Sequence, residues 1–231
     1  MGKEEQEKPV VGIDLGGTKI LAGVVDARGK IIGQAKRATK PEGGTESVVN
    51  RMAKTVREAI KAAGLEVGDI AAVCSCAPGT IDADRGVVRF APNLQNWENV
   101  PLAGLLGDAL KLPAFIENDV NLGTLGEHVL GAGQGISSLV GIFVGTGIGG
   151  GLILNGELWG GWRGGAGEVG HTVVLAEGPV CGCGSRGCVE ALASRTAIER
   201  DIWAGIKAGR ASLIPEIMRR DDRDRLTSSA L

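Results

Sequence analysis

The pattern of apolar and polar residues predicts three successive strands near the start of the chain. VVGIDL (residues 10–15) and ILAGVV (20–25) are short apolar runs, and KIIGQAKRA (30–38) follows a turn-forming stretch at residues 26–29. Glycines separate the first two runs, which is typical of a tight hairpin between strands. The three segments therefore predict a meander.

The spacing then changes to that of a helix. Apolar residues recur at intervals of three and four over residues 45–63, and Gly64 is a plausible end for this helix. The same criteria predict strands at 69–79 and 113–118, helices at 101–111 and 119–131, and an irregular, proline- and asparagine-rich loop at 91–101.

The opening pattern returns later in the chain. VGIFVGTGIGGGLIL (140–154) repeats the order of VGIDLGGTKILAGVV (11–25), and Asn155-Gly156 after it predicts a further hairpin. We interpret this as an internal duplication that gives two related α/β domains, assigned to residues 1–118 and 119–231.

Composition narrows the class of protein. The 231 residues are 43% hydrophobic and 23% charged, and the net charge is −2, so no basic excess is present to hold a nucleic acid. The N-terminus lacks an apolar signal-like run, and no apolar stretch approaches the ~18 residues of a membrane span. Five cysteines form an odd set, which favours a reducing, cytoplasmic compartment over a disulfide framework.

The two glycine turns are candidate phosphate-binding loops. Gly16-Gly17-Thr18 and Gly145-Thr146-Gly147 each lie between strands, whereas a dinucleotide fingerprint or a P-loop would lead into a helix. Backbone N–H groups beside a hydroxyl can surround phosphate oxygens. Asp14 is an expected partner of Mg²⁺ on a nucleotide, and Lys19 is a further candidate phosphate contact.

The alternative is that both turns are only tight hairpins. That alternative is favoured for either turn alone, whereas two matched copies in one chain favour a clamp on the phosphates of a nucleotide.

Asp119 is the candidate general base. Glu117-Asn118-Asp119 ends a predicted strand and opens a predicted helix, a position from which a carboxylate can accept the proton of a hydroxyl during phosphoryl transfer. Asn118 can hydrogen-bond the same polyol. The competing interpretation is that Asp119 is a helix N-cap, and for the tripeptide alone this is the favoured one.

A metal site is predicted near residue 180. His171, Cys181, Cys183 and Cys188 supply four soft ligands within eighteen residues, which suits a closed, structural Zn²⁺ site better than buried free thiols or a disulfide. Glycines between the cysteines would let the chain wrap around the ion. Cys74 and Cys76 lie in an apolar strand and are interpreted as packing residues.

Two glutamates flank this motif. Glu168 and Glu190 can accept hydrogen bonds from the hydroxyls of a sugar, and His171 can direct its second nitrogen to the same ligand. The alternative is that both glutamates are solvated, as is usual for this residue.

Six segments in the same order resemble the ROK family of repressors, open reading frames and sugar kinases. They are DLGGTKILAG (14–23), APG (77–79), ENDVN (117–121), GTGIGGG (145–151), GEVGH (167–171) and CGCGSRGCVE (181–190). The resemblance implies an actin-like, ribonuclease H-like fold of the hexokinase type, a homodimer, and ATP-dependent phosphorylation of a hexose.

The resemblance also implies roles for individual residues. Asp119 would be the catalytic base, and the sugar would contact Asn93, Asn118, Asp119, Glu168, His171 and Glu190. Zinc would bind His171, Cys181, Cys183 and Cys188, and the phosphates of ATP would lie near Asp14, Gly16, Gly17, Thr18, Gly145, Thr146 and Gly147.

The chain departs from the family in two places. Cys74-Ser75-Cys76 stands where members usually have glycine. The sequence also ends at LTSSAL where members continue, and for this reason we expect an incomplete C-terminal domain. Glucose is the favoured substrate, with fructose and N-acetylmannosamine as alternatives. A non-catalytic sugar-binding protein is a further alternative, whereas a repressor would need a helix-turn-helix ahead of residue 10.

Overall fold

The computed structural model describes residues 7–91, 94, 96–162, 164–221 and 226. Its contacts divide the chain into two compact units. Unit 1 consists of Met1–Gly141 and Gly151–Gly167, and unit 2 of Ile142–Gly150 and Glu168–Leu231. The assignment of domains to residues 1–118 and 119–231 stays a prediction.

A five-stranded sheet forms the centre of unit 1, with strand order β3-β2-β1-β4-β8. Its strands are β1 (Val10–Leu15), β2 (Lys19–Val25), β3 (Ile31–Ala38), β4 (Val73–Ala77) and β8 (Ala114–Asn118). The first three are antiparallel, which confirms the predicted meander, and β1, β4 and β8 run parallel. The strand predicted at 69–79 is shorter, at Val73–Ala77, and its first predicted residue belongs to a 3-10 turn, η2 (Val67–Asp69).

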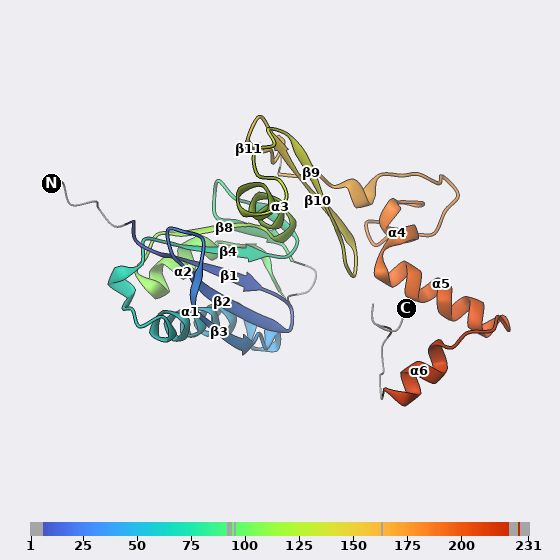
Figure 1. The fold of residues 1–231 in the computed structure, drawn as a ribbon, viewed down its shortest axis with the longest axis horizontal. Coiled ribbons are helices and arrows are strands. Elements are labelled where there is room, and N and C mark those ends of the chain that lie inside the picture. Colours follow the sequence, from blue (N-terminus) through green and yellow to red (C-terminus); the bar gives the residue numbers. More distant parts are fainter. Residues whose placement is uncertain (1–6, 92–93, 95, 163, 222–225, 227–231) are drawn as a thin grey trace. The chain divides into compact units, whose positions relative to one another are not determined.

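Among the described residues of this unit, three α-helices form, and their bounds agree with the predicted ones to within a residue. They are α1 (Gly44–Ala62), α2 (Leu102–Leu110) and α3 (Asp119–Leu130), and a 3-10 turn, η1 (Pro41–Gly43), precedes α1. Figure 1 shows α1 and α2 on one face of the sheet.

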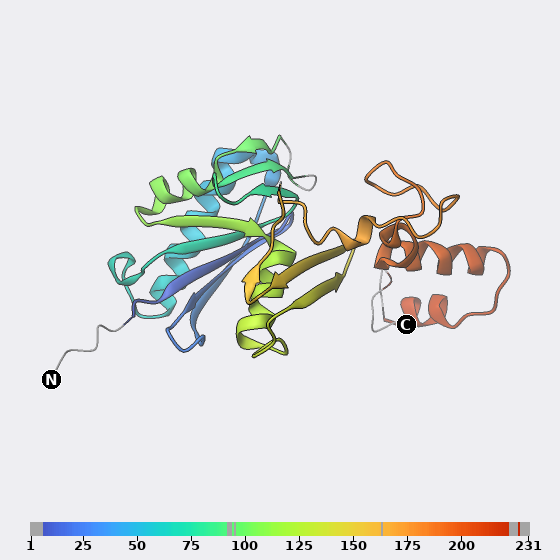
Figure 2. The same cartoon turned by 90° about the horizontal axis from the view of Figure 1, so that it is seen from above.

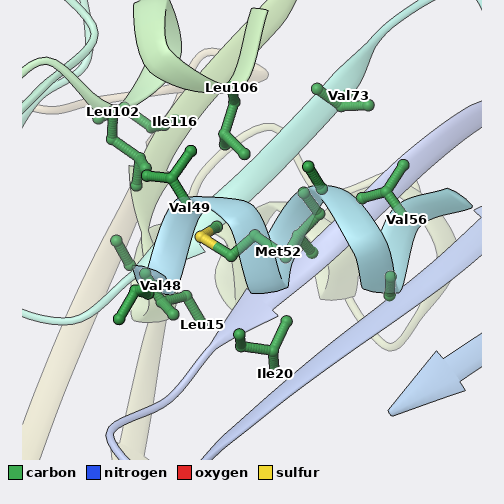
Figure 3. Close-up of a cluster of buried hydrophobic side chains, with 14 of the residues drawn as sticks. Leu15, Ile20, Val48, Val49, Met52, Val56, Val73, Leu102, Leu106 and Ile116 are labelled. Atoms are coloured by element: carbon green, nitrogen blue, oxygen red, sulfur yellow. The ribbon is translucent and has the colours of Figure 1, made fainter. Parts of the chain in front are cut away.

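The core of unit 1 lies between that face and these two helices. The helical spacing of apolar residues in α1 places Val49, Met52 and Val56 against the sheet, where Leu102 and Leu106 of α2 complete the cluster (Figure 3). Fully burying one such side chain contributes roughly 1.5–3 kcal/mol, so this layer is the main source of stability for unit 1.

A second, small sheet was not predicted. It consists of β5 (Thr80–Asp82), β6 (Val87–Phe90) and β7 (Glu98–Val100), in that order. The expectation of an irregular loop over 91–101 is therefore wrong at residues 98–100. Three-residue strands are too short to show a period of two in the sequence, and the hydrogen bonds to β6 form this one.

The predicted repeat is confirmed as a strand, a glycine turn and a second strand. The sheet has the order β11-β10-β9 and contains β9 (Leu139–Val144), β10 (Ile148–Leu154) and β11 (Glu157–Leu158). Asn155 and Gly156 have φ angles of 54° and 85°, as a two-residue hairpin of type I′ requires.

Unit 2 continues into short helices that the sequence pattern had not predicted. They are η3 (Val169–His171), α4 (Val189–Ala193), α5 (Arg195–Lys207) and α6 (Ile214–Arg220), and a loop at residues 208–213 joins the last two (Figure 2). The Ser194 hydroxyl caps α5 by accepting a hydrogen bond from the N–H of Ala197. Within the described residues, no helix is both long and apolar enough to cross a bilayer.

The Gly33→Ala substitution tests the packing of β3 on α1. A Cβ atom at residue 33 would lie 2.5 Å from the carbonyl oxygen of Ala59 and 2.6 Å from the nitrogen of Ala63. Gly33→Ala is expected to lower the free energy of unfolding by about 1–3 kcal/mol, because the helix must move away from the strand. Urea denaturation measures this value. Gly12→Ala in β1, where the added Cβ meets nothing within 4 Å, is the control, and equal losses in the two variants would contradict the interpretation.

Candidate active site and metal centre

Parallel strand pairing brings three chemically active side chains into one row. Asp14 of β1 pairs with Cys76 of β4, and Cys76 pairs with Glu117 of β8. The neighbouring row, with Ile13, Ser75 and Ile116, is buried on the opposite face. Side chains alternate between faces along a strand, so Asp14, Cys76 and Glu117 point away from the helical core.

This row corrects the interpretation of Cys76 as a packing residue. Its thiol donates a hydrogen bond to Oδ1 of Asp14 over 3.4 Å. Burial and the negative charge of Asp14 raise the pKa of Cys76 to about 12, so the sulfur is a neutral thiol at physiological pH. Burial also raises the pKa of Cys74. No sequence pattern indicates this contact, because 61 residues separate Asp14 from Cys76.

Asn118, and not Asp119, caps α3. The Asn118 Oδ1 atom accepts hydrogen bonds from the N–H groups of Val120 (2.9 Å) and Asn121 (3.2 Å). Its Nδ2 atom donates to the carbonyl oxygen of Gly79. The capping function is therefore supplied by the residue before Asp119, and the competing interpretation of Asp119 as the N-cap is wrong.

The Asp119 carboxyl lies at the first position of α3 and is exposed. Surrounding protein atoms remove part of its hydration, which raises its pKa, and the negative charge of Asp14 raises the pKa further. The N–H of Val120 acts in the opposite direction. A carboxylate with a raised pKa holds a proton more strongly, which suits a general base.

Thr39 donates two hydrogen bonds to the backbone of the first glycine turn. The Thr39 hydroxyl donates to the carbonyl oxygen of Gly16 (2.6 Å), and its N–H donates to that of Thr18 (2.9 Å). Thr39 is fully buried. Two carbonyl oxygens that would repel a phosphate are thereby hydrogen-bonded within the protein. Sequence reasoning missed Thr39, because only tertiary contact brings it to the turn.

The second glycine turn packs against Glu190. The Glu190 Oε2 atom accepts a hydrogen bond from the N–H of Ile148 over 2.9 Å, and a Cβ atom at residue 147 would overlap it. Gly147 is thus required for this approach. A role of Glu190 toward a sugar stays a prediction.

The four predicted metal ligands meet in unit 2. One ligand atom from each of His171, Cys181, Cys183 and Cys188 lies within 4.8 Å of all the others. The Sγ atoms of Cys183 and Cys188 are 3.7 Å apart, close to the edge of about 3.8 Å expected for sulfurs on a tetrahedral zinc with 2.3 Å bonds. The residues therefore fit a tetrahedral ion of the zinc type.

Glycines shape the loop around this cluster. Gly184 and Gly187 have φ angles of 90° and 69°, a region that L side chains rarely adopt, and a Cβ at residue 187 would overlap the carbonyl of Leu175. The loop therefore needs glycine at residues 184 and 187, whereas a Cβ at Gly182 would meet nothing within 4 Å.

The comparisons with known proteins agree with these features. The model of the ROK family matches residues 10–227. The chain belongs to the ROK family. It is 43% identical over 208 residues to a glucokinase of Thermotoga maritima, which covers 89% of this chain and 63% of that protein. A xylose repressor of Caldicellulosiruptor bescii is 34% identical, covering 87% of this chain and 50% of the repressor.

The fold of this ROK protein matches a solved relative. A ROK family glucokinase of Streptomyces griseus, crystallised with glucose and AMPPNP, aligns with a TM-score of 0.75 and 38% identity, covering 90% of this chain and 65% of the other. The chain thus spans less than two thirds of the length of each of these relatives. The mixed α/β ROK fold is confirmed over that part.

The structure places the remaining candidates as follows. Nε2 of His171 faces Glu168 Oε2 at 3.9 Å, and its Nδ1 faces Cys181 Sγ at 3.5 Å, so the two ring nitrogens serve different partners. Lys19 is exposed at the start of β2. Asn93 lies outside the described residues.

The thiols of the ROK metal motif differ in acidity. The N–H of Ser185 and a hydrogen bond from Cys181 lower the pKa of Cys183 to about 7. Burial raises the pKa of Cys181 to about 12 and also raises that of Cys188. Binding of zinc requires thiolates, so it would release protons from the buried pair.

Cys183→Ala tests the metal site. The variant is expected to lose about one equivalent of zinc per chain, because a three-ligand site binds the ion far more weakly. Elemental analysis of the purified protein measures this content. Cys74→Ala removes a thiol outside the cluster and should keep the zinc. A Cys183→Ala protein with the metal content of the unsubstituted chain would refute the assignment.

Proposed function

We propose that this protein transfers the γ-phosphoryl group of ATP to a hexose, with glucose as the favoured acceptor. The observation that supports this most is Asp119: Asn118 supplies the N-cap of α3, and the exposed Asp119 carboxyl, which also accepts the N–H of Val120, has a raised pKa. An exposed carboxylate with a raised pKa is suited to accept the proton of an alcohol.

On the acceptor side, the 6-hydroxyl of the sugar donates its hydrogen bond to Asp119. Its oxygen attacks the γ-phosphorus in line, the proton passes to the Asp119 carboxylate, and the bond from phosphorus to the ADP oxygen breaks. Sugar hydroxyls are assigned, as a prediction, to Asn93, Asn118, Glu168, His171 and Glu190.

On the donor side, the two glycine turns are assigned to the phosphates of ATP. Gly16, Gly17, Thr18 and Lys19 form the first group, and Gly145, Thr146 and Gly147 the second. Asp14 would hold Mg²⁺, which when bound offsets negative charge on the phosphates. The hydrogen bonds from Thr39 to the carbonyl oxygens of Gly16 and Thr18 support this assignment, because they hold those oxygens within the protein. The N–H of Gly16 donates to the carbonyl oxygen of Lys19, so the candidate donors to an anion are the N–H groups of Gly17 and Thr18.

Relatives named glucokinase and relatives named xylose repressor both match this chain at similar identity, so identity does not separate the two functions. The kinase is favoured by Asp119, because a catalytic base offers a sugar-responsive regulator no advantage. The actin-like, hexokinase-type duplication, the homodimer and the cytoplasmic location belong to the same proposal. Fructose, N-acetylmannosamine and sugar binding without catalysis are its alternatives, and a coupled assay of ADP release with each sugar separates them.

Asp119→Asn is the direct test of the base. The variant keeps the shape of the side chain but cannot accept the proton, so kcat is expected to fall by about 10²–10⁴-fold. Glucose binding, measured by calorimetry, should change little. Asp108→Asn in α2 removes a matched exposed carboxylate and should leave kcat unaltered. Retention of near-normal turnover by Asp119→Asn would remove Asp119 from the mechanism.

The raised pKa of Asp119 predicts a pH dependence. Only the ionised carboxylate accepts a proton, so kcat/KM should fall as the pH is lowered through the pKa of Asp119. Because that pKa lies above the ordinary value of 3.8, the fall begins at a higher pH than for an unperturbed aspartate. A pH–rate profile on the unsubstituted protein measures it. Zinc content is followed in parallel, and a kcat/KM that stays constant down to the ordinary aspartate range would contradict the prediction.

A further inference from the structure

The second glycine turn is attached to the first residues of α5 by three hydrogen bonds. The N–H of Arg195 donates to the carbonyl oxygen of Gly145 over 3.0 Å. The Thr196 hydroxyl donates to the carbonyl oxygen of Thr146 over 2.8 Å, and Nη2 of Arg195 donates to Oγ1 of Thr146 over 2.7 Å. These hydrogen bonds therefore fix the turn against the start of the helix.

Two of these hydrogen bonds orient the backbone carbonyl groups of the turn toward α5. The carbonyl oxygens of Gly145 and Thr146 carry partial negative charge and would repel a phosphate. Both accept hydrogen bonds from the start of α5, so they are directed to the helix. The same device holds the first turn, where Thr39 engages the carbonyl oxygens of Gly16 and Thr18.

The third bond fixes the role of the Thr146 hydroxyl. A guanidinium has donors and no acceptor, so the bond from Arg195 must use a lone pair of Oγ1. The hydroxyl proton of Thr146 is then available to be donated elsewhere. Thr146 and Arg195 are both exposed, so an anion from solvent can reach this hydroxyl.

We propose that Arg195 is a positioning residue for the phosphoryl donor. By holding Oγ1 of Thr146 as an acceptor, Arg195 makes the Thr146 hydroxyl a hydrogen-bond donor to a phosphate oxygen of ATP. This inference rests on the proposed function, in which residues 145–147 bind the phosphates.

The test compares Arg195→Gln with the unsubstituted protein. Glutamine keeps a polar side chain but cannot reproduce the charged bond to Thr146, so affinity for AMPPNP is expected to fall about 10-fold or more. Isothermal calorimetry gives this affinity without turnover. The KM for ATP should rise in proportion, whereas the KM for glucose should stay unchanged, a split that a general loss of folding would not produce.

Arg210→Gln is the matched control. Arg210 is an exposed arginine just beyond the other end of α5, so its loss removes the same charge from the same part of the chain. Its AMPPNP affinity should equal that of the unsubstituted protein. Zinc content of both variants reports that the rest of unit 2 is folded.

A double-mutant cycle separates positioning from direct contact. If Arg195 acts through Thr146, the effects of Arg195→Gln and Thr146→Val on AMPPNP affinity are not additive, and the double variant is about as weak as Thr146→Val alone. Additive losses would overturn the positioning role, as they would show that Arg195 meets the phosphate independently.

The outcomes distinguish this inference from the proposed function. If the unsubstituted protein binds AMPPNP and Arg195→Gln binds it with the same affinity, the inference alone is overturned. Nucleotide binding that depends on Arg195, in a protein that phosphorylates none of the sugars tested, supports the inference and overturns the proposed function. Absence of AMPPNP binding by the unsubstituted protein overturns both.

Discussion

The parallel pairing of β1, β4 and β8 is the constraint on which the candidate active site depends. It aligns Asp14, Cys76 and Glu117 across three strands and places Asp119 at the start of the helix that follows β8. Parallel strands end at the same edge, so residues far apart in sequence become neighbours there. The apolar residues of the adjacent row hold this register, because a shift of one position would turn the acidic side chains into the core.

The end of the parallel strands carries negative charge. Asp14 raises the pKa of Asp119, and Cys76 lies beside Asp14 as a neutral thiol, so the edge is acidic without a cation among these three side chains. A divalent ion held at Asp14, as proposed, would offset that charge.

Unit 2 is organised around the cysteine cluster. Glu190 follows Cys188 by two residues, and its carboxylate contacts both Cys181 and the N–H of Ile148 at the second glycine turn. The first residues of α5 reach the same turn. Glu190 thus connects a predicted metal ligand with the second glycine turn.

The sequence by itself determined the local features: the strand meander, helices α1 to α3, the repeated glycine turn, and the ligand set His171, Cys181, Cys183 and Cys188. Each of these is encoded in a short window by spacing or residue type. Tertiary structure alone decided that Asn118 caps α3, that Cys76 contacts Asp14, and that Thr39 and Arg195 hold the two turns. These contacts join residues whose separation in the chain carries no periodic signal, so only the packing of the strands and helices brings them together.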